Sequence, residues 1–307
     1  MTTYLVTGGA GFIGSHLVEA LLNRPDTKTV RVLDDLSTGH RHNLAPVMAK
    51  IQFMAGDLRD EACLAQAVAG VDIIFHLAAQ VSVPKSMVDP LTTHAINATG
   101  TLKLLQAAQQ AGVRRLVNTS TCAVYGDEPT LPKMETMRPE PKSPYAVAKL
   151  AAEGYCQHFT TYHHLETVTL RYFNVYGPRQ DPSSAYSGII SILIDRLAND
   201  QPVTIYGDGE QTRDFVYVGD VVMANLLAAE QTNAAGKTFN IGTKQATSIN
   251  QLYDLVSRLL DKPTKPTYGP AREGDIRHSW TDPQQAEQIL GWRAETALID
   301  GLREIIA

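Results

Sequence analysis

Short strand-like runs alternate with helical patterns through the first 174 residues of the chain. The runs, rich in Val, Ile, Leu and Thr, are TYLVTG (3–8), TVRVLDD (29–35), IQFMAGD (51–57), VDIIFHLAA (71–79), RRLVNTS (114–120) and ETVTLRYFN (166–174). Helical patterns fall at 12–23, 61–69, 91–111 and 144–163. Apolar runs separated by helices are typical of parallel strands that are buried on both faces. The sequence therefore predicts an α/β fold, with a doubly wound parallel sheet.

The character of the chain changes after Asn174. Loops rich in Pro, Gly and Tyr follow, such as VYGPRQDPSSAYSG (175–188) and QPVTIYGDGEQTRDF (201–215). We therefore expect a first domain over residues 1–173 and a smaller, less regular domain over 174–307. Residues 213–243 are expected to return to the first domain, with KTFNIGT (237–243) as a further strand of its sheet.

Composition excludes several classes of protein. The 307 residues are 44% hydrophobic, which is enough for a sizeable core, and the net charge of -5 argues against nucleic acid as a partner. No stretch of about 18 apolar residues and no basic leader is present, so we expect neither membrane insertion nor secretion. Cys63, Cys122 and Cys156 form no CxxC pair, which suits reduced thiols in a cytoplasm. The nine histidines show no metal-binding spacing, so no metal site is expected.

A glycine-rich turn joins the first predicted strand to the first predicted helix. VTGGAGFIG (6–14) places Gly8, Gly11 and Gly14 at the spacing that lets a backbone approach a pyrophosphate at a helix N-terminus. Asp34 closes the second strand twenty residues after Gly14, where a carboxylate accepts hydrogen bonds from a ribose 2′-hydroxyl and repels a 2′-phosphate. The pattern predicts a Rossmann-type site for NAD rather than NADP.

The stretch SPYAVAK (143–149) places Tyr145 and Lys149 on one face of a predicted helix. A free tyrosine has a pKa near 10, and lowering it by about three units takes roughly 4 kcal/mol. A partly buried ammonium beside a positively charged nicotinamide ring can supply this stabilisation. Tyr145 is therefore a candidate general base, with Lys149 as its partner.

A second cluster of hydroxyl groups ends the fifth predicted strand. NTSTCAVYG (118–126) carries Ser120 and Thr121. The carboxyl ends of parallel strands face the ligand crevice in a doubly wound sheet, so both hydroxyls are expected to point toward a substrate. Cys122 has no histidine adjacent in sequence to activate it and is interpreted as a small buried thiol.

The motifs together resemble the extended short-chain dehydrogenase/reductases, and within them the NAD-dependent nucleotide-sugar epimerases and dehydratases. The motifs that carry the resemblance are TGGAGFIG (7–14), DDLSTG (34–39), GDLRD (56–60), HLAAQ (76–80), NATGT (97–101), STCAVYG (120–126), YAVAK (145–149), RYFNVYGPRQ (171–180), DGEQTRDFVYVGD (208–220) and REGDIRHSW (272–280). Within the family, the subgroup of UDP-glucose/UDP-galactose 4-epimerases is the most similar.

The resemblance implies roles for individual residues. Tyr145, Lys149 and Thr121 would be catalytic, with Thr121 on the sugar 4-oxygen. NAD would be surrounded by Gly8, Gly11, Phe12, Ile13, Gly14, Asp34, Asp35, Ser37, Thr38, Gly39, Asp57, Leu58, Leu77, Ala78, Ala79, Asn97, Ser120, Tyr145, Lys149 and Tyr172. A UDP-sugar would be held by Ser82, Thr121, Asn174, Arg213, Arg272, Asp275 and Ser279. The two arginines offer bidentate geometry to the diphosphate.

Two further positions bear on the reaction. Related dehydratases carry Asp-Glu directly after the position of Thr121, and decarboxylases carry a Glu just before VYG, whereas this chain has Cys122 and Ala123. The extra acid or base that a further step needs is missing, which favours epimerisation. Ser279 aligns with a position that is a bulky tyrosine in some 4-epimerases, and a small residue there favours activity on N-acetylhexosamines as well.

Alternatives remain open at the level of sequence. Val81 stands where better-known 4-epimerases carry a lysine, which keeps uronate or pentose substrates open. A uronate epimerase, a decarboxylase, a reductase and a non-catalytic dinucleotide sensor are the alternatives. The resemblance also implies a homodimer, joined through the helices at 91–111 and 144–163.

Overall fold

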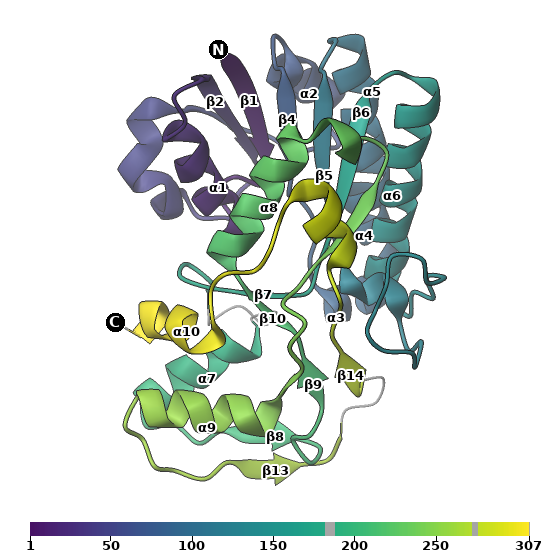
Figure 1. The fold of residues 1–307 in the computed structure, drawn as a ribbon. Coiled ribbons are helices and arrows are strands. Elements are labelled where there is room, and N and C mark those ends of the chain that lie inside the picture. The colour runs from purple at the N-terminus through teal and green to yellow at the C-terminus, as the bar shows by residue number, and fades with distance from the viewer. Residues whose placement is uncertain (182–187, 272–275, 307) are drawn as a thin grey trace.

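The computed structural model describes residues 1–181, 188–271 and 276–306. A large sheet flanked by helices forms one part of the molecule, and a smaller part with short strands and the C-terminus lies beside one end of that sheet (Figure 1). In the part of the chain that the structure describes, no helix combines the length and apolar character needed to cross a membrane.

The large sheet has seven strands, all parallel, in the order β11-β6-β5-β4-β1-β2-β3. Its strands are β1 (Thr2–Thr7), β2 (Thr27–Asp34), β3 (Gln52–Ala55), β4 (Ile73–His76), β5 (Arg115–Thr121), β6 (Glu166–Tyr172) and β11 (Thr238–Ile241). The expected doubly wound sheet is confirmed. The strand expected at 237–243 is β11, which pairs with β6 at the edge of the sheet.

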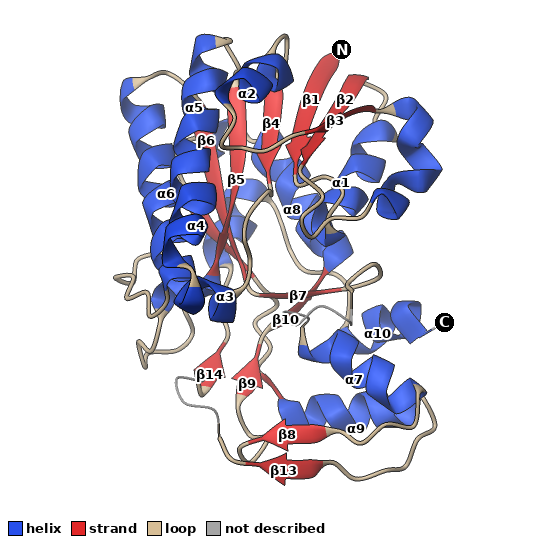
Figure 2. Cartoon of the chain, turned by 180° about the vertical axis from the view of Figure 1, so that it is seen from behind, coloured by secondary structure: helices blue, strands red, loops and turns tan. Residues whose placement is uncertain are grey.

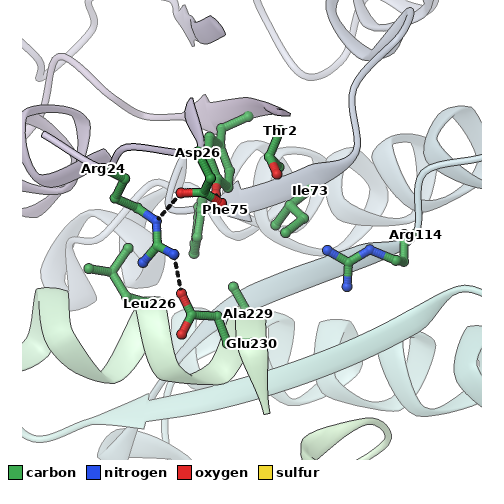
Figure 3. Close-up of a pocket in the computed structure, with 10 residues that line it drawn as sticks. Thr2, Arg24, Asp26, Ile73, Phe75, Arg114, Leu226, Ala229 and Glu230 are labelled. Carbon is green, nitrogen blue, oxygen red and sulfur yellow. Dashed lines mark hydrogen bonds and ion pairs between the residues drawn. The ribbon is translucent and has the colours of Figure 1, made fainter. Parts of the chain in front are cut away.

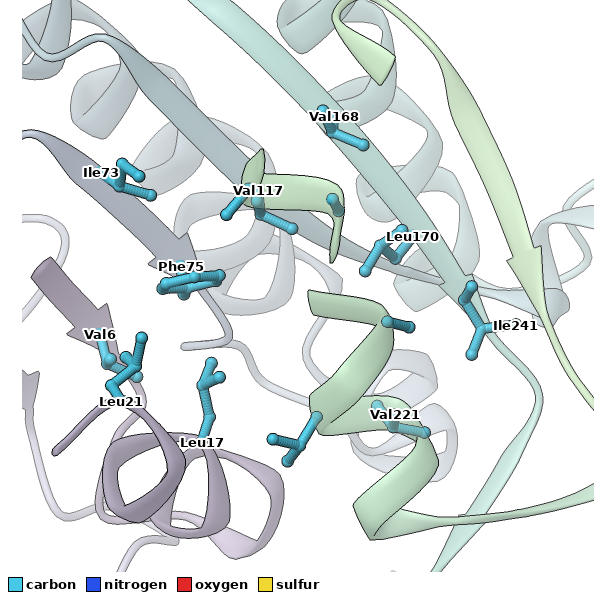
Figure 4. Close-up of a cluster of buried hydrophobic side chains, with 14 of the residues drawn as sticks. Val6, Leu17, Leu21, Ile73, Phe75, Val117, Val168, Leu170, Val221 and Ile241 are labelled. Carbon is cyan, nitrogen blue, oxygen red and sulfur yellow. The ribbon is translucent and has the colours of Figure 1, made fainter. Parts of the chain in front are cut away.

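Alternate strand residues enter two cores because neighbouring side chains on a strand leave opposite faces. Val6, Phe75 and Val117 pack on one face (Figure 4), and their neighbours Leu5 and Ile74 pack on the other. Each of these side chains is fully buried and contributes about 1.5–3 kcal/mol of transfer free energy. Burial on both faces fits the near-continuous apolar runs of β1 and β4, whose residues are buried at almost every position.

Helices cover both faces of this sheet (Figures 1 and 2). Helices α1 (Phe12–Leu22) and α8 (Val218–Glu230) pack on the face of Val6, and α2 (Glu61–Val68), α5 (Thr101–Gln110) and α6 (Pro144–Tyr162) pack on the other. The other helical segments of this part are α3 (Val83–Val88), α4 (Pro90–His94) and the short turns η1 (Arg41–Lys50), η2 (Ala95–Gly100), η3 (Cys122–Tyr125), η4 (Thr232–Ala234) and η5 (Ala286–Leu290).

The helix predicted at 91–111 is interrupted. A π-helical turn, η2, lies between α4 and α5. Asn97 within η2 donates from Nδ2 to the Gln80 carbonyl and accepts at Oδ1 from the Gln80 N–H, both at 2.8 Å. Gly100, where a Cβ would lie 3.1 Å from the Leu58 Cβ, ends the turn. A wider turn accommodates these contacts, which the apolar spacing alone does not reveal.

The smaller part has its own apolar core, which includes Leu193, Ile205, Phe215, Leu252 and Leu302. Its elements are β7 (Asn174–Tyr176), α7 (Ile189–Ala198), β8 (Thr204–Tyr206), β9 (Thr212–Arg213), β10 (Phe215–Tyr217), β12 (Thr247–Ser248), α9 (Ile249–Leu259), β13 (Thr267–Gly269), β14 (His278–Ser279) and α10 (Leu298–Ile306). The pairing of β9 with β14 places Arg213 beside Ser279.

Candidate active site

The glycine-rich turn after β1 brings backbone into close contact with backbone. A Cβ on Gly14 would lie 2.2 Å from the Gly8 carbonyl oxygen, and one on Gly8, at φ +71°, would lie 2.6 Å from the Ala78 nitrogen. Gly11 begins α1 without a side-chain cap, which leaves first-turn N–H groups, including those of Phe12 and Ile13, to a ligand. This loop fits a pyrophosphate.

Asp34 lies at the carboxyl end of β2 beside this loop. Its carboxylate accepts from the N–H of Ala10 at 2.9 Å and of Leu36 at 2.8 Å, and burial raises its pKa. A Cβ on Gly39 would come within 3.0 Å of both carboxylate oxygens. Two hydrogen bonds leave lone pairs over for ribose hydroxyls, so the position fits the adenosine half of NAD.

The other predicted cofactor residues fall into two groups. Leu77, Ala78 and Ala79 follow β4, next to Gly8. Most of the others contact protein groups. Ser37 donates to Asp35, Asp57 pairs with Arg59, and Asn97 holds the backbone of Gln80. Leu58 is buried under Gly100, and the Tyr172 hydroxyl accepts from Asn225 and Thr119. Thr38 lies in the loop between Ser37 and Gly39.

Thr121, Tyr145 and Lys149 come together where β5 ends against the start of α6. Ser143 caps α6 by accepting from the Ala146 N–H at 3.2 Å, so the helix begins just before Tyr145. The Thr121 side chain lies next to the Tyr145 hydroxyl, close enough to favour the ionised form of the tyrosine. Lys149 Nζ donates to the Thr119 carbonyl oxygen at 2.6 Å. The structure therefore brings the three predicted catalytic residues together.

The pKa values of this group differ from the sequence-based expectation. Burial raises the pKa of Tyr145 to about 12, although the hydrogen bond from Thr121 opposes this effect. Burial also lowers the pKa of Lys149 to about 8. The protein groups around Tyr145 thus do not lower its pKa by themselves, because the desolvation cost exceeds the hydrogen-bond gain.

The expectation that both strand-end hydroxyls face the crevice is wrong for Ser120. Its hydroxyl is buried and donates to Glu153 on α6, two helical turns beyond Tyr145. The clustering of hydroxyls in the sequence does not reveal that each one has a different partner. Glu153 in turn pairs with Arg171, at 2.6 Å. The sequence patterns did not single out Glu153, although it follows Lys149 by one helical turn.

Two residues of the predicted substrate side, Arg213 and Ser279, lie near the reacting group. Both are close enough to Cys122, the neighbour of Thr121, to favour its thiolate form. Burial raises the pKa of the Cys122 thiol to about 11, which agrees with an inert thiol. Ser279 is 6% exposed, so its small side chain lies inside the protein, near Cys122.

The remaining predicted substrate residues lie at different distances from this group. Asn174 is in β7, and its buried Oδ1 has no hydrogen-bond partner among the described residues. Ser82 caps α3 by accepting from the Lys85 N–H at 2.9 Å. Arg272 and Asp275 lie outside the described residues.

A pocket of about 210 Å³ lies at the amino ends of the strands, where β1 begins at Thr2 and β4 begins at Ile73 (Figure 3). Arg24 in this pocket pairs with Asp26 at 3.1 Å and with Glu230 at 2.5 Å. The predicted site residues gather instead at the carboxyl ends of the strands, as expected for ligand binding by a doubly wound sheet.

The sequence profile described as the NAD dependent epimerase/dehydratase family matches residues 4–242. This chain belongs to that family. A UDP-glucose 4-epimerase of Mycolicibacterium smegmatis is 40% identical over 307 residues, which cover 98% of this chain and 96% of the relative. The dependence on NAD agrees with the glycine turn and Asp34.

Solved structures agree over nearly the whole length. The UDP-glucose 4-epimerase of Thermotoga maritima with UDP-glucose has a TM-score of 0.94 at 39% identity, covering 99% of this chain and 97% of that one. The UDP-N-acetylglucosamine 4-epimerase of Methanobrevibacter ruminantium, in complex with UDP-N-acetylmuramic acid, has a TM-score of 0.94 at 37% identity and the same coverage. A relative from Thermodesulfobacterium geofontis, 32% identical over 100% of this chain and 95% of its own length, is named UDP-glucuronate 4-epimerase.

Proposed function

We propose that this protein is a UDP-hexose 4-epimerase that interconverts UDP-glucose and UDP-galactose, and also the N-acetylated pair. The observation that carries the proposal is the pair of Thr121 and Tyr145 hydroxyls on the same site as Lys149. In the sequence, Thr121 is followed by Cys122 and Ala123 rather than by carboxylates. The relatives named UDP-glucose 4-epimerase and UDP-N-acetylglucosamine 4-epimerase support it.

The proposed chemistry assigns a proton to each stage. Tyr145 Oη removes the proton of the sugar 4-hydroxyl, whose oxygen is held by Thr121, and later returns it to the other epimer. NAD, when bound, accepts and returns the C4 hydride, and its positively charged ring favours ionised Tyr145. The 4-keto sugar rotates between the two stages, so that the hydride returns to the other face of C4. Because the hydride is returned, no net oxidation occurs. Lys149 adds positive charge close to the base.

A nearby carboxylate is not free to act as a further acid or base. Asp214 lies within electrostatic range of Cys122 and is 0% exposed. It accepts from the N–H and hydroxyl of Thr243, both at 2.7 Å, and from the Thr281 N–H at 3.3 Å. Its hydrogen bonds tie together loops of the smaller part. This occupation supports an epimerase over an enzyme that goes on to remove water or carbon dioxide.

Substrate selection is proposed to depend on Arg213, Asn174 and Ser279. The charge of Arg213 suits the diphosphate. Asn174 is proposed as a hydrogen-bonding neighbour, since it pairs with Phe215, two residues after Arg213. Ser279, which contacts Cys122 beside Thr121, leaves room for the acetamido group of an N-acetylhexosamine. Arg272 and Asp275 are proposed as further contacts to the diphosphate and the uridine ribose.

The protein is also proposed to be a homodimer. Exposed apolar side chains follow one face of α6 and continue onto α3 and α4, which pack against α6: Val147, Tyr155, Tyr162, Met87, Val88 and Leu91. Leu91 is 82% exposed and Val88 is 87% exposed, and a contiguous apolar face of this kind is typical of an interface.

The test is a panel of UDP-sugars with product analysis and no added reductant. We expect UDP-glucose to give UDP-galactose, and Tyr145→Phe to lower kcat by roughly 10²–10⁴-fold. Tyr155→Phe, an exposed tyrosine of the same helix, is the matched control and should retain full activity. Turnover of UDP-glucuronate but not of UDP-glucose would instead favour a uronate epimerase.

A further inference from the structure

Three consecutive turns of α6 contact the last three residues of β5. Tyr145 lies next to the Thr121 side chain, Lys149 donates to the Thr119 carbonyl, and Glu153 accepts from the Ser120 hydroxyl. Positions four apart lie on one helix face, so the helix and the strand end are joined at three successive heights. The Ser120–Glu153 bond is the contact that does not include a proposed catalytic residue or the backbone.

Glu153 is held from a third element as well. Arg171 on β6 donates to Glu153 from Nε at 3.0 Å and from Nη2 at 2.6 Å. The guanidinium also donates to the hydroxyl of Tyr125, the last residue of η3, at 2.9 Å. Glu153 is 8% exposed and Arg171 is 5% exposed. A charge pair this deep adds little net stability and is retained more readily where it fixes a geometry.

We propose that Glu153, paired with Arg171, is a positioning residue: it fixes the carboxyl end of β5 against α6, so that the Thr121 and Tyr145 hydroxyls meet. The inference rests on the proposed function for its effect on turnover. It adds a residue to the site without giving that residue contact with the reacting atoms.

Glu153 has a second effect, on the charge of Lys149. The groups facing Lys149 are Tyr145, Glu153 and Cys156 of its own helix, the Thr119 carbonyl of β5 and His76 of β4. Burial lowers the pKa of Lys149, whereas Cys156 and Glu153 favour the ammonium.

Two of these neighbours carry no charge at neutral pH. Burial raises the pKa of Cys156 to about 12, and burial lowers the pKa of His76 to about 3. Of the two groups that favour the ammonium, the Glu153 carboxylate is therefore the one that carries a charge at neutral pH.

Two variants separate positioning from general structural support. Ser120→Ala cuts the tie and leaves the ion pair intact. The double variant Glu153→Met/Arg171→Met removes both charges without leaving one unpaired, which preserves stability better than either single change. Glu166→Gln is the matched control, because Glu166 pairs with buried Arg115 at 2.7 Å on the same two strands, at their opposite end.

We expect both test variants to lose about tenfold or more in kcat, with KM for UDP-glucose and NAD content within about twofold of wild type. The alkaline limb of the kcat–pH profile should move to lower pH in the double variant alone, since only that variant lacks the carboxylate near Lys149. Hydrogen exchange of residues 119–126 should accelerate in both. Glu166→Gln should change none of these properties.

Two results would overturn the proposal. One is a wild-type kcat in the double variant, when each protein is assayed equally far below its own melting temperature. The other is an unmoved alkaline limb together with unchanged hydrogen exchange of residues 119–126. A wild-type protein that turns over no UDP-sugar would refute the proposed function instead. In that case the exchange measurement and an NMR titration of the Lys149 amine still decide the positioning role.

Discussion

Replacing Lys149 by methionine should stabilise the protein at neutral pH while it removes activity. The ammonium of Lys149 is 3% exposed, and burial lowers its pKa from the ordinary 10.5 to about 8. A difference of about 2.5 between the two pKa values means that burying the charged lysine lowers the free energy of unfolding at pH 7 by about 3 kcal/mol. Lys149→Met removes this cost.

Part of the gain is offset. The Thr119 carbonyl oxygen, which accepts from Lys149 Nζ at 2.6 Å, loses its donor, at a cost of about 1–3 kcal/mol. We therefore expect a net gain of about 1 kcal/mol at pH 7. The loss of activity follows because methionine places no positive charge near Tyr145. A trade of stability against function of this kind is common at active sites.

The difference in stability between wild type and Lys149→Met should change with pH. Between the folded pKa of about 8 and the ordinary value of 10.5, the unfolded chain keeps the lysine proton and the folded protein does not. Wild-type stability should therefore rise with pH through this window, relative to the variant. The advantage of Lys149→Met should disappear, and then reverse, as the pH approaches about 10.

The assay is urea unfolding of both proteins across this pH range, at equal NAD occupancy because bound NAD also stabilises the fold. Lys103→Met is the control. Lys103 also donates to a backbone carbonyl, that of Arg59, at 3.0 Å, but its side chain is 29% exposed and pairs with Glu61. It should give no gain. A Lys149→Met variant that is less stable at pH 7, or a difference that does not change with pH, would refute the reasoning.

Three further outcomes are expected. Ser279→Tyr should lower turnover of UDP-N-acetylglucosamine relative to UDP-glucose, measured as a ratio of kcat/KM, and an unchanged ratio would contradict the size argument. Gly14→Ala should lose bound NAD and melt at lower temperature, because the added Cβ would lie 2.2 Å from the Gly8 carbonyl; NAD content after purification measures it, and wild-type content would count against the proposed loop. Val147→Glu with Leu91→Glu should convert the proposed dimer to a monomer in analytical ultracentrifugation, whereas Met223→Glu on α8 should not, although Met223 is 51% exposed against 48% for Val147.

The apolar runs and their spacing were sufficient to predict the parallel sheet. Burial on both faces favours a near-continuous apolar run in a strand, and this signal is local. The strand at 237–243 was also predicted, whereas the π-turn at Ala95–Gly100 was not. That turn depends on contacts of Asn97 with Gln80 and of Gly100 with Leu58, which lie far apart in the chain.

The sequence by itself determined which residue types could do the chemistry: a glycine turn, an aspartate at a strand end, a hydroxyl, a tyrosine and a lysine. Only the tertiary structure decided what each one contacts. It separated Thr121, which meets Tyr145, from Ser120, which meets Glu153, and it brought Ser279 beside Cys122 from more than 150 residues away. The reason is physical: spacing fixes the face of a strand or helix, but burial and pairing between elements fix the partner and the pKa.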